Sequence, residues 1–334
     1  MSFLRAFFRV SVVFASLLSP SLTLAQGAPP DVPGAPADVP GAPPDVIVSV
    51  RPIHSLVTAV MDGVAVPKLL LGRGETPHAY NLTPSDARAL SRADMVVWIG
   101  EPLETFLESP LANLASDAVI LELIEAPGLT LLDNRDGGVW DLSESGDTHK
   151  HDHDHDHSHD HGQIDGHIWL SPQNARVIVS WVAQALGALD PSNAAQYKNN
   201  AVALTALLQT MENDIRATLA PVTRQPFLTA HDALQYFDRY FDLSAVGAIA
   251  VTPDRAPSAK RLAEIRDHAQ ALGSLCILTE PGFEPGVMRV IEESADVSVG
   301  RVDPLGVEIE PGRTLYIDLM TGIAGALVEC LQNR

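Results

Sequence analysis

Short apolar runs alternate along the chain with stretches in which apolar residues recur every third or fourth position. In the first half, the apolar runs predict buried strands over 46–50, 67–72, 95–100 and 118–124. The helices expected between these strands cover 52–61, begin at Thr83-Pro84, and pass through Leu103 and Phe106. Strands and helices that alternate at this spacing predict a parallel sheet with helices on both faces.

Two successive helices follow the first set of strands. One is expected over 172–186, with Gly187 as its stop signal. The other, over 191–219, would be about 40 Å long at the rise of an α-helix. Its apolar positions recur at spacings of four and three: Tyr197, Ala201, Leu204, Leu208, Met211 and Ile215.

The alternation of strands and helices then returns in the second half. Strands are expected over 227–230, 244–251, 274–280 and 298–302, and helices over 232–240 and 257–272 and from Pro285 and Pro311. We therefore predict an α/β protein with two small α/β lobes. Their mainly parallel sheets are joined by one long backbone helix, and a ligand cleft lies between the lobes.

The N-terminus has the features of an export signal. Arg5 and Arg9 flank an apolar segment and Thr23-Leu24-Ala25 offers a small-residue cleavage site. The following segment is a proline-rich seven-residue repeat with too little apolar surface to fold. The expected organisation is a signal peptide (1–25), a tether (26–45), an N-terminal lobe (46–190) with a His/Asp-rich loop (147–165), a linking helix (191–220) and a C-terminal lobe (221–334). No later segment is an uninterrupted apolar span long enough to cross a bilayer, so we expect an exported, soluble protein.

The two cysteines of the chain are Cys276 and Cys330. Neither follows the predicted signal peptide, which argues against a lipid anchor attached at that position. In an oxidising compartment two distant cysteines pair more often than they stay free, and Cys330 is expected on the helix face that meets the strand with Cys276. We predict a disulfide that stabilises the fold by about 4 kcal/mol on the chain-entropy estimate, and two buried thiols are the alternative.

A histidine-rich tract lies between the two halves. Its histidines alternate mainly with aspartates and are His149, His151, His153, His155, His157, His159 and His161. This pattern forms no apolar stripe, so we expect a solvated loop that serves as a secondary metal-binding segment. An expression tag is the alternative, but tags lie at chain ends. The formal net charge of −20 at pH 7 suits a protein that handles cations and argues against nucleic acid or an anionic membrane as partner.

Four residues outside the tract lie where open α/β sheets place their ligands, after a strand or at the start of a helix. They are His78, His167, His231 and Glu280. Three imidazoles and a carboxylate suit a borderline cation in tetrahedral geometry, which favours Zn2+ over magnesium or calcium. Asp165 and Asp232 are expected either to accept imidazole N–H bonds or to cap helices. We interpret His54 and His268 as structural.

Several motifs resemble a known family, the zinc and manganese substrate-binding proteins of bacterial ABC importers. They are PHAYNLTPSDARAL (77–90), ADMVVWIG (93–100), GHIWLSP (166–172), TAHDALQYF (229–237), TEPGFEP (279–285) and DPLG (303–306). The resemblance covers about 46–334, and the His/Asp-rich loop and the cysteine pair are similar to the Gram-negative zinc members. It implies His78, His167 and His231 as ligands in a monomeric periplasmic receptor, which delivers zinc to a membrane permease and catalyses no reaction.

The fourth ligand stays open at this point. Some zinc members carry a glutamate directly before the first histidine, where this chain has Pro77 and its nearest acid is Glu75. Other members use an acid at the place of Glu280, which we favour, with water as the alternative. Two competing hypotheses are a periplasmic zinc store or chaperone, which the tract alone would allow, and a zinc hydrolase. Against the hydrolase, the chain has no H-E-x-x-H helix and no evident pairing of a general base with a nucleophile.

Overall fold

The computed structural model describes residues 41–72, 74–78, 80–135, 138–140, 164–250, 257–272, 275–283, 286, 288–289 and 297–332. The predicted signal peptide, most of the predicted tether, the histidines 149–161 and most of the helix expected from Pro285 lie outside these residues. The residues from 40 onward belong to one unit by their internal contacts. That unit contains both of the predicted sheets.

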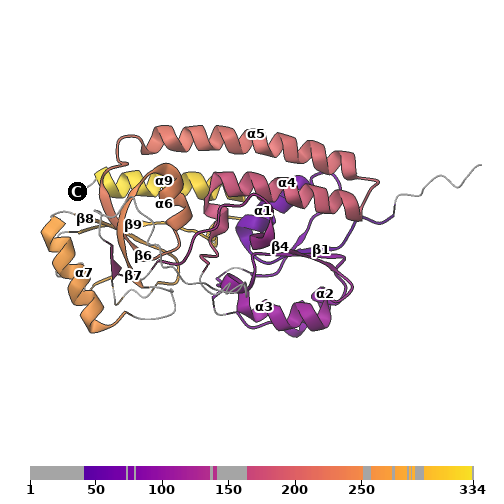
Figure 1. Ribbon diagram of the computed structural model, residues 1–334, viewed down its shortest axis with the longest axis horizontal. Coiled ribbons are helices and arrows are strands. Elements are labelled where there is room, and N and C mark those ends of the chain that lie inside the picture. Colours follow the sequence, from indigo (N-terminus) through magenta and orange to yellow (C-terminus); the bar gives the residue numbers. More distant parts are fainter. Residues whose placement is uncertain are drawn as a thin grey trace, which may run out of the picture. The chain divides into compact units, whose positions relative to one another are not determined.

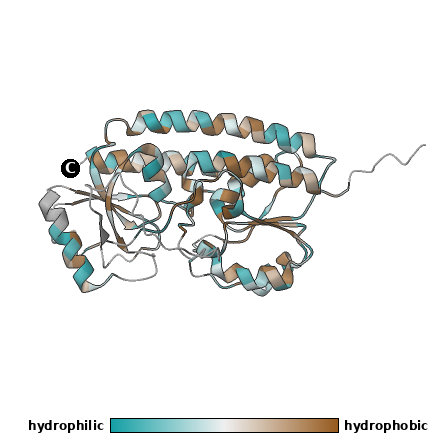
Figure 2. Ribbon diagram, viewed as in Figure 1, coloured by the Kyte–Doolittle hydropathy of each residue, from teal (hydrophilic) through white to brown (hydrophobic). Residues whose placement is uncertain are grey.

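The first sheet is parallel throughout and has the strand order β2-β1-β3-β4. Its strands are β1 (Val46–Val48), β2 (Lys68–Leu69), β3 (Met95–Trp98) and β4 (Val119–Glu122), and its helices are α1 (Arg51–Val60), α2 (Pro84–Leu90) and α3 (Glu101–Leu114). Every residue of β1 and β3 is buried, as expected for strands with helices on both faces. Figure 2 shows the strands of this sheet largely in the colour of hydrophobic residues. The predicted strand over 67–72 shrinks to two residues.

The start predicted for α2 is confirmed by its cap. The Thr83 side chain accepts a hydrogen bond from the Asp86 backbone, and the Asp86 carboxylate accepts one from the Thr83 backbone at 3.0 Å. Two backbone donors at the helix start are satisfied by this capping box. Tyr80 also donates to Asp86 at 2.8 Å, so the cap fixes the end of the loop that carries His78.

The second sheet has the order β5-β7-β6-β8-β9. Its parallel strands are β6 (Pro226–His231), β7 (Ser244–Ala250), β8 (Leu275–Thr279) and β9 (Val297–Arg301), with helices α6 (Gln235–Phe241) and α7 (Ala259–Leu272). The sequence did not predict β5 (Gly138–Val139), which pairs antiparallel with β7. This strand lies within 46–190, the range predicted for the N-terminal lobe, and pairs with the second sheet. A strand of two residues is too short to show a periodic pattern in the sequence.

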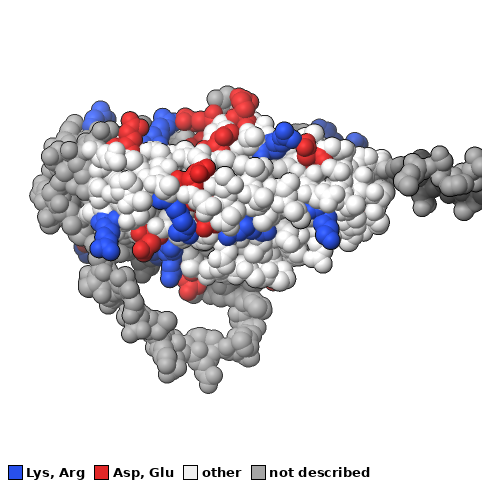
Figure 3. Space-filling model, turned by 90° about the horizontal axis from the view of Figure 1, so that it is seen from above, with Lys and Arg blue, Asp and Glu red and all other residues white. Residues whose placement is uncertain are grey.

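Three long helices lie together and span the two sheets (Figure 1). They are α4 (Pro172–Leu189), α5 (Ala194–Leu219) and α9 (Leu315–Gln332). All six apolar positions predicted to form the inner stripe of α5 are buried. On the α5 face seen in Figure 3, basic and acidic side chains intermingle among the described residues, without a broad basic patch.

The prediction that Gly187 ends its helix is wrong. Helix α4 continues to Leu189 and ends at Asp190. A Cβ atom on Gly187 would lie 3.3 Å from the Cβ of Ala194, at the start of α5. The glycine therefore allows a close approach between two helices, which local sequence could not distinguish from a stop signal.

Helix α9 is, among the described residues, the one helix long and apolar enough by composition to cross a membrane. Half of its residues are buried in the protein, and it packs against α1, α5, β8 and β9. These contacts identify α9 as a core helix. Its apolar composition follows from its burial against these elements.

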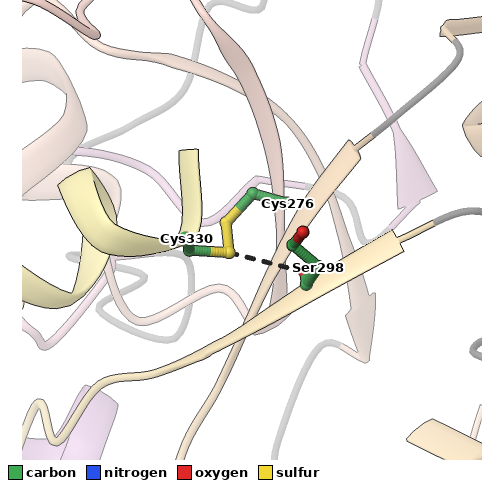
Figure 4. Close-up of a disulfide and its surroundings, with 3 residues drawn as sticks. All are labelled: Cys276, Ser298 and Cys330. Atoms are coloured by element: carbon green, nitrogen blue, oxygen red, sulfur yellow. Dashed lines mark hydrogen bonds between the residues drawn. A yellow bond between two sulfur atoms is a disulfide. The ribbon is translucent and has the colours of Figure 1, made fainter. Parts of the chain in front are cut away.

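The predicted disulfide is confirmed in the structure (Figure 4). Cys276 on β8 and Cys330 near the end of α9 have Cα atoms 5.6 Å apart and are separated by 54 residues. A Cβ atom on Gly300 of β9 would lie 2.8 Å from the Cβ of Cys330, so glycine is required where the helix crosses the strand. Closing a loop of this length stabilises the fold by about 4 kcal/mol on the chain-entropy estimate.

Candidate metal site

His167 is held in place by residues close to it in the chain. It precedes the short 3₁₀ helix Ile168–Leu170, whose three side chains are fully buried. The carboxylate of Asp165 accepts hydrogen bonds from the His167 backbone N–H at 2.9 Å and from ring atom Nδ1 at 2.7 Å. A proton on Nδ1 leaves the lone pair of Nε2 available as a metal ligand. Gly166 is needed here because a Cβ would lie 2.7 Å from the Cβ of Leu103.

His231 is the last residue of β6, and Glu280 directly follows β8. These two strands are neighbours in the sheet, so their carboxyl ends meet at the same edge. Ring atom Nδ1 of His231 lies 2.9 Å from Oε1 of Glu280. The His231 side chain thus has the same kind of carboxylate partner as the side chain of His167.

His78 comes from the loop between β2 and α2 and is half-buried. Its backbone N–H donates to the Thr76 hydroxyl at 3.3 Å. Among the described residues, we find no hydrogen-bond partner for its imidazole ring. His78 therefore enters the site with less support than the other two histidines.

The three imidazoles converge on one point. Their ring centroids are 5.6 Å apart for His78 and His167, 5.2 Å for His78 and His231, and 5.1 Å for His167 and His231. One possible ligand atom from each residue lies within 4.8 Å of those of the other two. They line a cavity of about 200 Å³ together with Glu280, and Glu75 also lines this cavity. Three nitrogen donors this close together could supply three of the four ligands of a tetrahedral metal site.

The electrostatic surroundings of two of these histidines differ. Burial, together with the neighbouring rings of His167 and His231, lowers the pKa of His78 to about 3. Burial also opposes the charged form of His167, but the charge of Asp165 and its hydrogen bond outweigh this effect and raise the pKa of His167. The His78 ring is therefore neutral at physiological pH, which is the form that binds metal.

The structure places the remaining candidates as follows. Asp165 accepts a hydrogen bond from the His167 ring, which is one of the two roles expected for it. Asp232 does not contact His231 in this way, and its carboxylate instead forms an ion pair with Arg135. His54 is buried, with Nε2 at 3.0 Å from the Pro67 carbonyl, which agrees with a structural role. The side chain of His268 and the histidines of the tract lie outside the described residues.

Sequence reasoning missed residues around the site that hold these groups in place. Tyr236 donates to the Asp165 carbonyl at 2.9 Å, and Gln235 donates to the Asp133 carbonyl at 3.1 Å. Tyr236 and Gln235 lie within the TAHDALQYF motif, so the motif contained a signal for them. Arg135 had none, because its partners lie about 100 residues away in the chain.

Two α/β lobes on a long connecting helix, with three imidazoles converging on a cavity, define a substrate-binding protein for a metal ion. Comparison with known proteins specifies the family. Residues 46–330 match the family model described as zinc-uptake complex component A, periplasmic, and the chain belongs to this family. It is a family of substrate-binding proteins and not of enzymes.

Individual relatives agree with this assignment. The high-affinity zinc uptake system protein ZnuA of Brucella suis biovar 1 (strain 1330) is 39% identical over 306 residues, which cover 86% of this chain and 92% of that protein. A crystal structure of ZnuA has a TM-score of 0.71 at 23% identity and covers 86% of this chain and 98% of its own. The structure of FpvC from Pseudomonas aeruginosa in complex with Mn2+ has a TM-score of 0.69 at 22% identity. It covers 87% of this chain and 99% of its own. At such identities the two structures establish the shared fold and leave the choice of ion to the chemistry of the site.

Proposed function

We propose that this protein captures zinc in the periplasm and delivers it to the membrane permease of an ABC importer. The convergence of His78, His167 and His231 on one cavity is the observation that carries the proposal. Neutral imidazoles are borderline donors that suit Zn2+, whereas magnesium and calcium favour oxygen shells. The relatives named for zinc uptake support the same ion and the same role. Residues 1–25 would direct export, and we expect a monomer.

Glu280 is our proposed fourth ligand. In the structure its Oε1 atom faces Nδ1 of His231. If the ion binds His231 through Nδ1, the carboxylate can turn from the ring to the ion. If the ion binds through Nε2, Glu280 keeps its hydrogen bond, orients the ring and leaves the fourth position to water. Glu75 is a weaker candidate, because its carboxylate already accepts a hydrogen bond from the Gly72 backbone.

Calorimetry with zinc on the purified protein tests the assignment. We expect one tight zinc ion at the three-histidine cavity and loss of this tight ion in His167→Ala. Retention of tight, one-to-one binding in that variant would contradict the proposed site. Growth at limiting zinc of a strain that lacks this protein, with and without the gene restored, separates uptake from storage. If the protein serves uptake, restoring the gene should restore growth.

A further inference from the structure

Residues 131–135, called the stem segment here, lie against α6 and against the backbone next to His167. Three hydrogen bonds close a cycle between them. The Leu132 N–H donates to the Tyr236 hydroxyl at 3.0 Å, this hydroxyl donates to the Asp165 carbonyl at 2.9 Å, and the Asp165 N–H donates to the Leu132 carbonyl at 2.8 Å. The Tyr236 hydroxyl therefore acts as donor and acceptor at once.

This cycle is connected to the metal cavity through Asp165. Asp165 receives the Tyr236 bond on its backbone carbonyl, while its carboxylate binds both the backbone and the ring of His167. Tyr236 is 2% exposed, so water cannot replace its hydroxyl without rearrangement of the packing. Loss of that hydroxyl would leave the partly buried N–H of Leu132 and the buried carbonyl of Asp165 without this partner.

A second branch connects the stem segment to the residue after His231. Arg135 donates from Nε to Asp232 at 2.8 Å and forms a further ion pair with the buried Asp238 at 3.2 Å. Its guanidinium lies 3.8 Å from the ring centroid of Trp140. One short segment is thus bonded to the chain beside each of the two buried histidines.

We propose that Tyr236 is a positioning residue for the metal site, with Arg135 as its counterpart on the His231 side. The inference rests on the proposed function and adds a determinant of how long zinc stays bound. By fixing the Asp165 backbone, Tyr236 holds the Asp165 carboxylate against Nδ1 of His167 and keeps Nε2 directed at the cavity before the ion arrives. The histidine then loses little freedom on binding, which slows zinc release.

The test compares Tyr236→Phe with Tyr197→Phe. Tyr197 is also fully buried, and its hydroxyl donates to Asp190 at 2.9 Å near the α4–α5 connection, outside the metal cavity. Each variant removes one buried hydroxyl and keeps the ring. Zinc release into excess chelator, the absorption spectrum of the Co2+-loaded protein and the unfolding of the metal-free protein are measured for both.

We expect Tyr236→Phe to release zinc about 10-fold faster, the lower end of the loss in metal affinity when a direct partner of a metal-binding histidine is removed. Its cobalt spectrum should shift, whereas Tyr197→Phe keeps the wild-type rate and spectrum. Arg135→Met, which leaves the cycle intact, should also accelerate release. A wild-type release rate in both Tyr236→Phe and Arg135→Met would overturn the proposal, as would equal acceleration in the two tyrosine variants. Tight zinc binding by His167→Ala would instead reject the metal site itself.

Discussion

The three histidines of the site are supported very unequally. His167 and His231 are 6% and 5% exposed, and each has a carboxylate within hydrogen-bonding distance of its Nδ1 atom. His78 is half-buried on a loop, and its ring has no such partner among the described residues. Two of the three proposed ligands are therefore oriented before an ion arrives, while the third would have to be ordered by the ion.

This difference suits a protein that must release what it binds. The two oriented rings would provide much of the affinity, because little conformational freedom is lost if they coordinate the ion. The loop ligand completes the shell and is the one that can withdraw with the smallest loss of protein contacts.

Removal of a histidine should have the largest effect on zinc binding. Each of His78→Ala, His167→Ala and His231→Ala should weaken binding by on the order of 3 kcal/mol, about 100-fold, since a structural zinc site gains 10–16 kcal/mol from about four ligands. Calorimetry should show smaller losses for His78→Ala than for the other two. His54→Ala, which removes a buried histidine outside the cavity, is the control. An equal or larger loss in His78→Ala would break the comparison drawn above.

Changes at Glu280 should come next and show which role it has. As a ligand, Glu280 should be replaced poorly by either Gln or Ala, and both variants should lose about 10- to 100-fold in affinity. As an orienting group it should be replaced well by Gln, which keeps an acceptor for Nδ1, and poorly by Ala. Competition titrations with a zinc chelator measure both variants. Wild-type affinity in Glu280→Gln would assign the fourth position to water.

Glu104→Gln should change stability and leave zinc affinity unaltered. Glu104 is fully buried, accepts from the Ile99 N–H at 2.6 Å, and burial raises its pKa to about 7. The unfolded chain has the lower pKa, so deprotonation costs stability as the pH rises from about 4.5 to 7. The loss is on the order of 3 kcal/mol above pH 7. Glu104→Gln should flatten this dependence in denaturant unfolding at several pH values, and an unchanged slope would contradict the assigned pKa.

Deletion of 149–161 should have the smallest effect on the cavity. The tract is a predicted loop that must lose chain entropy for every ion it chelates, whereas the three histidines of the cavity lie on or near folded elements. Calorimetry should retain one tight zinc ion and lose weaker, multiple-ion binding. Loss of the tight ion would mean that the tract supplies ligands to the cavity.

Much of the fold was predictable because burial leaves a periodic signal. The fully apolar runs of β1 and β3, the inner stripe of α5 and the cap at Thr83 all depend on residues close together in the chain. The disulfide could also be predicted, since it follows from two cysteines and the elements that carry them. The candidate histidines stood out because they follow strands or precede helices, where parallel sheets bring their ligands together.

What the sequence determined by itself is therefore the alternation of elements and the set of residues able to bind metal. The tertiary structure decided which partner each of those residues received. Asp232 lies beside His231 in sequence, yet its carboxylate pairs with Arg135. Gly187 does not end its helix but lies at a close approach to Ala194 of the next helix. Strand β5 exists because β7 offers it an open edge. Such pairings depend on which surfaces meet when the two sheets pack on shared helices. The partners are far apart in the chain, so no local sequence pattern indicates them.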